Sequence, residues 1–187
     1  MKAPDAMTGL TPLHEAQQIV LDAAAPLGLE KVSILDALGR VLGEDVIAER
    51  HNPPWDNSAM DGFAVRAEDI AQQHAITKPV TLTVIEDVPA GKMPTRSVGK
   101  GQAIRIMTGA PIPKGADTVV KVEDTEHTPE SVRVFKAESR GANIRPQGED
   151  VKQGDCIIPK GTRIRSGEAG MLAILAKSFV LVYQRPR

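Results

Sequence analysis

Three segments of this chain contain more polar side chains and glycines than the connection of strands requires. The first, residues 51–65, includes the only tryptophan of the chain, Trp55, and four polar residues: Asp56, Asn57, Ser58 and Asp61. Two adjacent prolines stiffen the beginning of this segment, because each fixes φ and restricts the residue before it. Gly62 then permits a tight turn before a strand that begins at Phe63.

The other two segments have residue types that bind anions. In residues 105–117 a strand is predicted to run into Thr108 and Gly109, where a hydroxyl and free backbone N–H groups can face an oxyanion without a full positive charge. In residues 141–151, Arg145 lies close to two carboxylates, Glu149 and Asp150. A guanidinium is well shaped for phosphate, so this segment predicts a phosphate contact.

Each segment also has a purely structural interpretation. Asp and Asn beside Gly are common turn formers, and Trp55 could fill a small core. The sequence has no Ser/His/Asp order, no metal-spaced His pair and no P-loop. Its four histidines are scattered, at His14, His51, His74 and His127. General motifs alone therefore predict a domain with polar loops and leave both interpretations open.

Composition narrows the class of protein. A formal charge of -1 argues against a broad nucleic-acid footprint. The single cysteine, Cys156, excludes an intrachain disulfide or a Cys-based zinc site within one chain, and fits a reducing compartment. Residues 1–10 contain no apolar signal segment, and no uncharged run approaches the roughly 18 residues that span a bilayer. We expect a soluble, cytoplasmic protein with no nucleic-acid or membrane partner.

Helical periodicity occurs near both ends of the chain. A helix is predicted after the N-cap Thr11, ending at Gly28, and a shorter one from Ser33 to Gly39. A last helix is predicted after the N-cap Ser166. In the region between the second helix and this last one, short β-branched runs alternate with Pro and Gly. The predicted strands in this β-rich region and after it are residues 80–85, 103–107, 118–123, 132–136, 156–158 and 179–183.

This order predicts an α+β, β-rich fold with two domains. Residues 1–50 and 143–187 are expected to form one discontinuous mixed domain, because helical signals occur on both sides of the β-rich middle. Residues 51–142 are expected to form the inserted β-rich domain.

The three polar segments resemble those of a known family. Residues 53–64, PPWDNSAMDGFA, resemble the signature loop of the molybdopterin molybdenumtransferases, the family of bacterial MoeA and of the E domain of gephyrin. Residues 107–111 with 115–117 resemble a second family segment, and residues 143–145 with 148–150 resemble a third. Three ordered matches cover the chain from about Thr11 to its end.

The resemblance implies an enzyme that inserts molybdenum from molybdate into adenylylated molybdopterin and releases AMP, with a divalent cation such as Mg²⁺. It implies an elongated homodimer, whose cleft lies between an α/β domain of one subunit and the β-rich front part of the other. That α/β catalytic domain is expected to begin just after Arg187, so this chain alone is expected to be inactive. The alternative is a non-catalytic dimerisation or scaffold module, since gephyrin uses the same framework for assembly.

The resemblance also suggests site residues. Molybdate and pyrophosphate are anionic, so carboxylates alone would repel them, whereas carboxylates that hold a metal ion would not. Thr108 and its neighbouring N–H groups could donate to an oxyanion, and a binding role without proton transfer is equally compatible. The expected catalytic residues are Asp61, Thr108 and Asp150, with Asp61 and Asp150 as metal candidates. The expected substrate-binding residues are Asn57, Ser58, Gly109 and Arg145.

Overall fold

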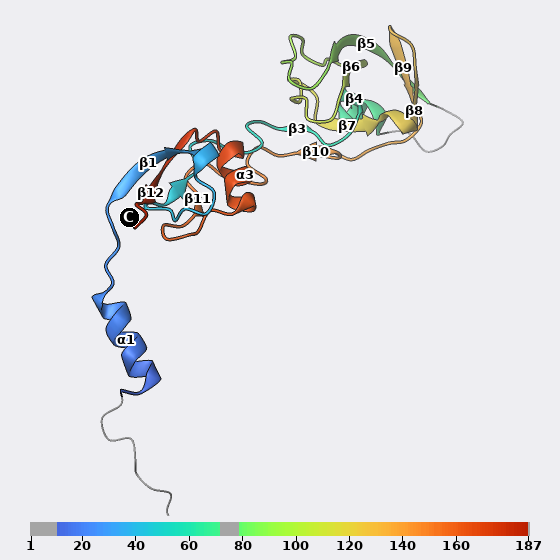
Figure 1. Cartoon of the computed structure of the whole chain (residues 1–187). Helices are drawn as coiled ribbons and strands as arrows, with labels where there is room; N and C mark the ends of the chain where they lie inside the picture. Colours follow the sequence, from blue (N-terminus) through green and yellow to red (C-terminus); the bar gives the residue numbers. More distant parts are fainter. Residues whose placement is uncertain (1–10, 72–78, 187) are drawn as a thin grey trace, which may run out of the picture. The chain divides into compact units, whose positions relative to one another are not determined.

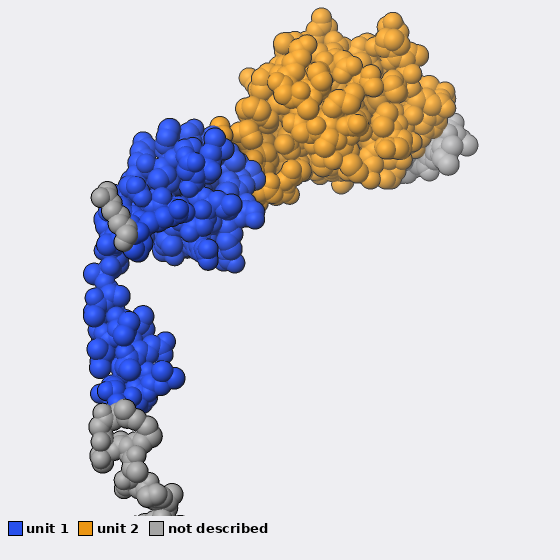
Figure 2. Space-filling model, viewed as in Figure 1, with its two compact units in different colours: residues 1–46, 158–187 blue, residues 47–157 orange. Residues whose placement is uncertain are grey.

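The computed structural model describes residues 11–71 and 79–186 (Figure 1). Backbone contacts divide the chain into two compact units, residues 1–46 with 158–187 and residues 47–157 (Figure 2). The expected boundaries, at residues 50 and 143, differ from this division. The reason is local: β10 (Ile144–Arg145) pairs with β3 (Asn57–Ser58) and so belongs to the second unit. His74 and residues 1–10 lie outside the described residues.

The second unit is built on a mixed six-stranded sheet in the order β7-β4-β6-β5-β9-β8. All of its strand pairs are antiparallel except β5 with β6, which is parallel. The strands are β4 (Gly62–Val65), β5 (Val80–Val88), β6 (Gln102–Ile106), β7 (Thr118–Lys121), β8 (Thr125–His127) and β9 (Ser131–Val134). A short helix, α2 (Ala67–Ile70), and the turn η2 (Val122–Asp124) connect them.

Both faces of this sheet carry buried side chains along β4, β6 and β7. Successive residues of a strand point to opposite faces, and the two faces contribute to two separate apolar clusters. Phe63 and Val120 belong to one cluster, while their neighbours Ala64 and Val119 belong to the other. Aliphatic side chains fill most of both clusters, in line with the low aromatic content of 3%.

The first unit contains the two ends of the chain. Here β1 (Leu29–Ser33) pairs antiparallel with β12 (Phe179–Tyr183), from Leu29 opposite Tyr183 to Ser33 opposite Phe179. The 3₁₀ turn η1 (Ile34–Asp36) and the helix α3 (Ser166–Ile174) contact each other. The helix α1 (Leu13–Ala23) has no buried residue. The strands β2 (Val46–Ile47) and β11 (Cys156–Ile158) form a further two-stranded sheet.

The observed elements confirm the α+β, β-rich class. The strands predicted at 156–158 and 179–183 have those bounds, and the other predicted strands lie within a few residues of their observed ends. The helix predicted at 33–39 was wrong: only one 3₁₀ turn forms there, capped by the Ser33 hydroxyl, which accepts from the Leu35 N–H at 3.3 Å. Along residues 11–71 and 79–186, no helix is long and apolar enough to cross a bilayer.

Candidate functional site

The turn that presents Asp61 is fixed by the strands around it. Gly62 begins β4, which lies between β6 and β7. A Cβ atom on Gly62 would lie only 1.9 Å from the carbonyl oxygen of Val120, so the close approach of β7 requires glycine there. The Val122 N–H donates to the Asp61 carbonyl at 3.0 Å. The direction of the Asp61 side chain is therefore set by the sheet.

Asp61 and Thr108, from the first and second polar segments, come together at the surface. The backbone N–H and the hydroxyl of Thr108 both donate to Asp61 Oδ1, at 2.7 and 2.8 Å. These two hydrogen bonds outweigh the opposing effect of desolvation and, with a further contribution from the positive charge of Arg105, hold the pKa of the Asp61 carboxyl below its usual range. The residue is thus an ionised carboxylate at neutral pH.

This pairing changes what Thr108 can do. Its two donors already point to Asp61, so a bound oxyanion would have to compete with that carboxylate for them. Asp61 Oδ2, by contrast, accepts no hydrogen bond within the described part of the chain. In this arrangement the group offered to a ligand is a carboxylate oxygen, whose natural partners are a cation or a hydrogen-bond donor.

Ser58 and Gly109 connect the first two segments to each other. The Ser58 N–H donates to the Ala110 carbonyl at 2.9 Å, and the Gly109 N–H donates to the Ser58 carbonyl at 2.8 Å. Ser58 is fully buried, and its hydroxyl donates to the carbonyl of Met60 at 2.5 Å. Asn57 is 8% exposed, and its Oδ1 has no partner among the described residues. Ser58 and Gly109 therefore use their polar groups to hold the loops together.

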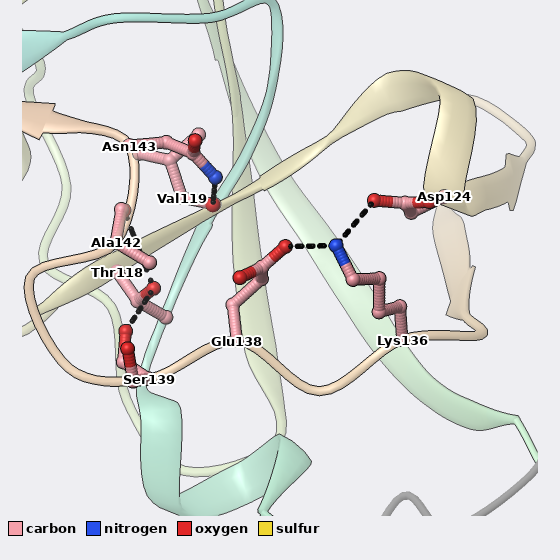
Figure 3. Close-up of polar contacts among 8 residues, drawn as sticks. All are labelled: Thr118, Val119, Asp124, Lys136, Glu138, Ser139, Ala142 and Asn143. Carbon is pink, nitrogen blue, oxygen red and sulfur yellow. Dashed lines mark hydrogen bonds and ion pairs between the residues drawn. The ribbon is translucent and has the colours of Figure 1, made fainter.

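The chain segment that leads to the third polar loop is attached to β7 (Figure 3). Asn143, at φ 58°, donates from its side-chain amide to the Val119 carbonyl at 2.8 Å. The Thr118 hydroxyl donates to the Ser139 carbonyl at 2.9 Å (Figure 3). Both contacts join a side chain to a backbone carbonyl and lie outside the strand pairing of the sheet. They fix the position at which β10, with Arg145, begins.

Nearer the start of the same segment, Lys136 lies between two carboxylates (Figure 3). Its ammonium group donates to Glu138 at 2.9 Å and lies 3.7 Å from Asp124. The hydrogen bond to Glu138, together with both negative charges, raises the pKa of Lys136. The segment is thus anchored at both its ends by groups on β7 and η2.

Arg145 is occupied by its own loop. Its Nε donates to Glu149 at 2.7 Å, and one terminal nitrogen donates to both oxygens of Asp150, at 2.9 and 2.8 Å. The hydrogen bonds to Glu149 and then Asp150 raise the pKa of this guanidinium. Two carboxylates around one cation leave the group with a net negative charge, so the phosphate contact expected of Arg145 would first require these ion pairs to open.

The expected metal candidates do not form a common cluster. Asp61 contacts Thr108 and Asp150 contacts Arg145. Within residues 11–71 and 79–186, no group of three or more His, Cys, Asp or Glu side chains could hold a metal ion. Mg²⁺ demands an octahedral set of oxygens, and these two carboxylates alone do not supply one. Asp61 Oδ2 fits as a single ligand at most.

Two contributions were missed by sequence reasoning. The positive charge of Arg105, on β6, helps to lower the pKa of Asp61, and the spacing of these two residues in the sequence does not reveal this effect. Gln147 donates from its backbone N–H to Asp56 and from its side chain to the Pro54 carbonyl, both at 2.7 Å. Trp55, which could have filled a core, is instead 42% exposed.

Comparison with known proteins places this arrangement in a family. Residues 11–176 match the family described as the MoeA N-terminal region (domain I and II). The chain belongs to the MoeA family. This MoeA-family chain is 39% identical over 179 residues to the molybdopterin molybdenumtransferase of Bacillus subtilis (strain 168). The matched region covers 94% of this chain and 41% of that protein. The enzyme of the same name from Synechococcus elongatus is 43% identical over 143 residues, covering 76% of this chain and 35% of that protein.

Solved structures agree with the sequence match. The crystal structure of the molybdopterin biosynthesis moeA protein from Pyrococcus horikoshii OT3 superimposes with a TM-score of 0.88 at 40% identity, covering 95% of this chain and 47% of that one. The MoeA-family chain therefore spans less than half the length of the relatives it matches, and it corresponds to their N-terminal region.

Proposed function

We propose that this chain is the N-terminal part of a molybdenum cofactor biosynthesis enzyme, a molybdopterin molybdenumtransferase. The proposed reaction inserts molybdenum from molybdate into adenylylated molybdopterin and releases AMP. Membership of the MoeA family supports the general role, and the relatives in that family bear the transferase name. The observation that carries the site is the Asp61–Thr108 contact, which joins two of the three family segments at an exposed position.

In this proposal Asp61 acts as an orienting carboxylate. Its Oδ1 is held by both Thr108 donors, so Oδ2 is presented in one direction. A carboxylate held in this way can position a hydrated cation or a donor group of the substrate without rearranging. Mg²⁺, implied by the family resemblance, would supply charge neutralisation between anionic reactants. Its remaining ligands would have to come from outside the residues described.

Asp150 and Arg145 have a separate proposed role. Their ion pair is exposed, and such pairs exchange readily with other charged partners at little cost. An incoming phosphate could take the place of Asp150 on the guanidinium, and this would free the carboxylate. We therefore keep Arg145 as a proposed substrate contact and Asp150 as a proposed catalytic group that becomes available in that exchange.

The test of the proposed function uses the full-length parent protein. We expect it to insert molybdenum into adenylylated molybdopterin and to release AMP, whereas the 187-residue chain alone is expected to do neither. Catalysis requires groups fixed on both sides of the reacting centre, and the three polar loops supply only one side. A full-length protein that binds the substrate but never releases AMP would contradict the proposal.

A non-catalytic dimerisation or scaffold module is the alternative, and one observation favours an assembly role in either case. The apolar residues Leu13, Ile19, Val20 and Leu35 of the first unit are exposed. We propose that the chain forms a homodimer through this unit, since exposed apolar side chains, three of them on α1 and Leu35 on η1, commonly mark an interface. We also propose a cytoplasmic location, because a lone, free and exposed cysteine, Cys156, suits a reducing compartment.

A further inference from the structure

We propose that a pocket in the second unit binds the part of the substrate in which a flat heterocycle carries a phosphate. The pocket has a volume of about 670 Å³. Its walls are the loop at Trp55, residues 93–97, residues 111–116 and Gln147. It is distinct from the Asp61–Thr108 contact, because neither of those residues lines it.

The wall that carries Trp55 is held by Gln147, which itself lines the pocket. The Gln147 backbone N–H donates to the Asp56 carboxylate and its side-chain amide donates to the Pro54 carbonyl, both at 2.7 Å. The Ile112 N–H donates to the Asp56 carbonyl at 2.9 Å. The backbone on both sides of Trp55 is thus fixed, and the indole is presented on a rigid loop.

A second wall, residues 93–97, is held by a carboxylate that is not part of the lining. Glu86 accepts from the Thr95 N–H at 3.1 Å, from the Thr95 hydroxyl at 2.7 Å and from the Arg96 N–H at 2.9 Å. These three hydrogen bonds fix the backbone from which the Arg96 side chain extends.

The third wall is fixed by close backbone packing. The Val98 N–H donates to the Lys114 carbonyl at 2.8 Å. Gly115 has φ +87°, and a Cβ atom there would lie 2.2 Å from the Val98 carbonyl oxygen, so only glycine allows this approach. The backbone of all three walls is therefore fixed by hydrogen bonds and close packing, and these contacts do not fill the pocket.

The groups that remain free in the pocket have one chemistry in common. Arg96 and Lys114 are exposed and have no ion-pair partner among the residues described. A guanidinium and an ammonium at one site favour phosphate. Trp55 and Met93, 42% and 55% exposed, offer an indole face and a polarisable thioether, and both side chains pack on flat rings. Asp56 is the one acidic residue of the lining, and its Oδ1 accepts the hydrogen bond from the Gln147 N–H.

The choice of ligand rests on the proposed function. Adenylylated molybdopterin contains two flat rings, a pterin and an adenine, joined through a pyrophosphate. Either half has the chemistry that the pocket offers, a ring next to a phosphate. Which half is bound is decided by experiment, with AMP and neopterin monophosphate as the two probes.

The titration uses the 187-residue chain and the fact that Trp55 is its only tryptophan. We expect AMP or neopterin monophosphate to bind with a Kd below about 1 mM by calorimetry, and AMP to change the tryptophan fluorescence if the adenylate half is recognised. Adenosine, neopterin and inorganic phosphate should each bind at least about tenfold more weakly, because each lacks one of the two groups.

Matched variants assign the binding to this pocket. Arg96→Gln with Lys114→Gln should weaken the tighter probe by about 10- to 100-fold, the range expected for lost charged hydrogen bonds. Trp55→Leu should weaken it by about tenfold. Lys100→Gln, an exposed lysine of the same unit outside the pocket, should leave the affinity unchanged. Circular dichroism and melting temperature of each variant confirm that it is folded.

Three results would overturn the inference. They are no binding of either probe, equal binding of inorganic phosphate alone, or unchanged affinity in the folded Arg96→Gln/Lys114→Gln variant. The parent enzyme separates this failure from that of the proposed function. If the wild-type parent inserts molybdenum and the double variant does so with unchanged KM, the pocket assignment fails while the function stands. If the wild-type parent shows no insertion, the function fails, and the titration alone decides the pocket.

Discussion

At the scale of single residues, Asp61 has two tasks that one substitution can separate. It holds Thr108 through Oδ1, and it presents a charged Oδ2. Asp61→Asn keeps an acceptor oxygen for both Thr108 donors but removes the charge. In the full-length protein we expect only a small drop in melting temperature at neutral pH and a loss of molybdenum insertion of about 10- to 100-fold, the range for losing one charged contact.

The measurement for Asp61→Asn is turnover beside thermal melting, with Thr108→Ser as the control. Serine keeps both donors, so that variant should stay close to wild type in both readouts. Full activity of Asp61→Asn would show that its charge has no part in the reaction. A lower melting temperature with normal turnover per folded molecule would instead reduce Asp61 to a turn former, the structural interpretation that the sequence left open.

The same contact predicts a dependence of stability on pH. Because the folded-state pKa of Asp61 is lowered, mainly by the Thr108 N–H, its contribution to stability is present above the ordinary carboxyl pKa and is lost as pH falls through the lowered one. Melting of the 187-residue chain should therefore show a wild-type advantage over Asp61→Asn at neutral pH that shrinks below about pH 4. A difference that stays constant down to about pH 2.5, or that grows, would be incompatible with the Thr108 contact.

Single residues also show where sequence reasoning stopped. Asp61 and Thr108 were both expected to be catalytic because both lie in family segments, yet the sequence could not reveal that Thr108 donates to Asp61. Likewise, the sequence placed Glu149 and Asp150 close to Arg145, but only the fold of the loop shows that both carboxylates pair with its guanidinium. Donor and acceptor pairing depends on three-dimensional contacts, which residue type and spacing do not encode.

At the scale of elements, apolar runs such as residues 156–158 and 179–183 were predictable, and paired segments that carry polar or charged residues were not. The run at 179–183 is apolar throughout and was predicted with its observed bounds. Its partner β1 (Leu29–Ser33) includes Glu30 and Lys31 and forms a strand only because β12 lies beside it. That pairing is also why the chain turns at η1 and does not continue as the predicted helix. Tertiary pairing here overrides local propensity.

The strand β4 supplies a test of element packing. Gly62→Ala would place a Cβ atom 1.9 Å from the Val120 carbonyl oxygen, so β4 and β7 would have to separate. We expect a loss of about 1 to 3 kcal/mol in the free energy of unfolding, the range for overpacking. Gly167→Ala is the matched control, since it lies in α3 with nothing within 4 Å, and alanine there should stabilise by about 0.5 to 1 kcal/mol.

Denaturant unfolding of the 187-residue chain measures both glycine variants. Opposite signs for the two would support the close approach of β4 and β7 as the reason for glycine at position 62. If Gly62→Ala did not lower the free energy of unfolding, the distance between position 62 and the Val120 carbonyl would have to be longer than in the structure.

At the scale of the whole molecule, α1 needs a partner. An isolated helix of this length is marginal in water, and α1 has 11 residues, none of them buried. Leu13 and, on η1, Leu35 are 85% and 88% exposed. Nothing within the described part of the chain stabilises these side chains by burial, so a second copy of the chain is the proposed source of that contact.

The last prediction is therefore a homodimer that depends on α1. Sedimentation equilibrium of the 187-residue chain should give a dimer at micromolar concentration. Leu13→Gln with Val20→Gln should raise its dissociation constant by at least about tenfold, since burial of each apolar side chain contributes about 1.5 to 3 kcal/mol. Because neither residue is buried within the chain, both units should remain folded in that variant. Ile47→Gln, a change at an apolar residue of the second unit that is 42% exposed, should leave the dimer intact. A wild-type chain that stays monomeric well above micromolar concentration, or a dimer weakened only by Ile47→Gln, would place the assembly surface elsewhere and leave the exposure of Leu13 and Leu35 without a physical cause.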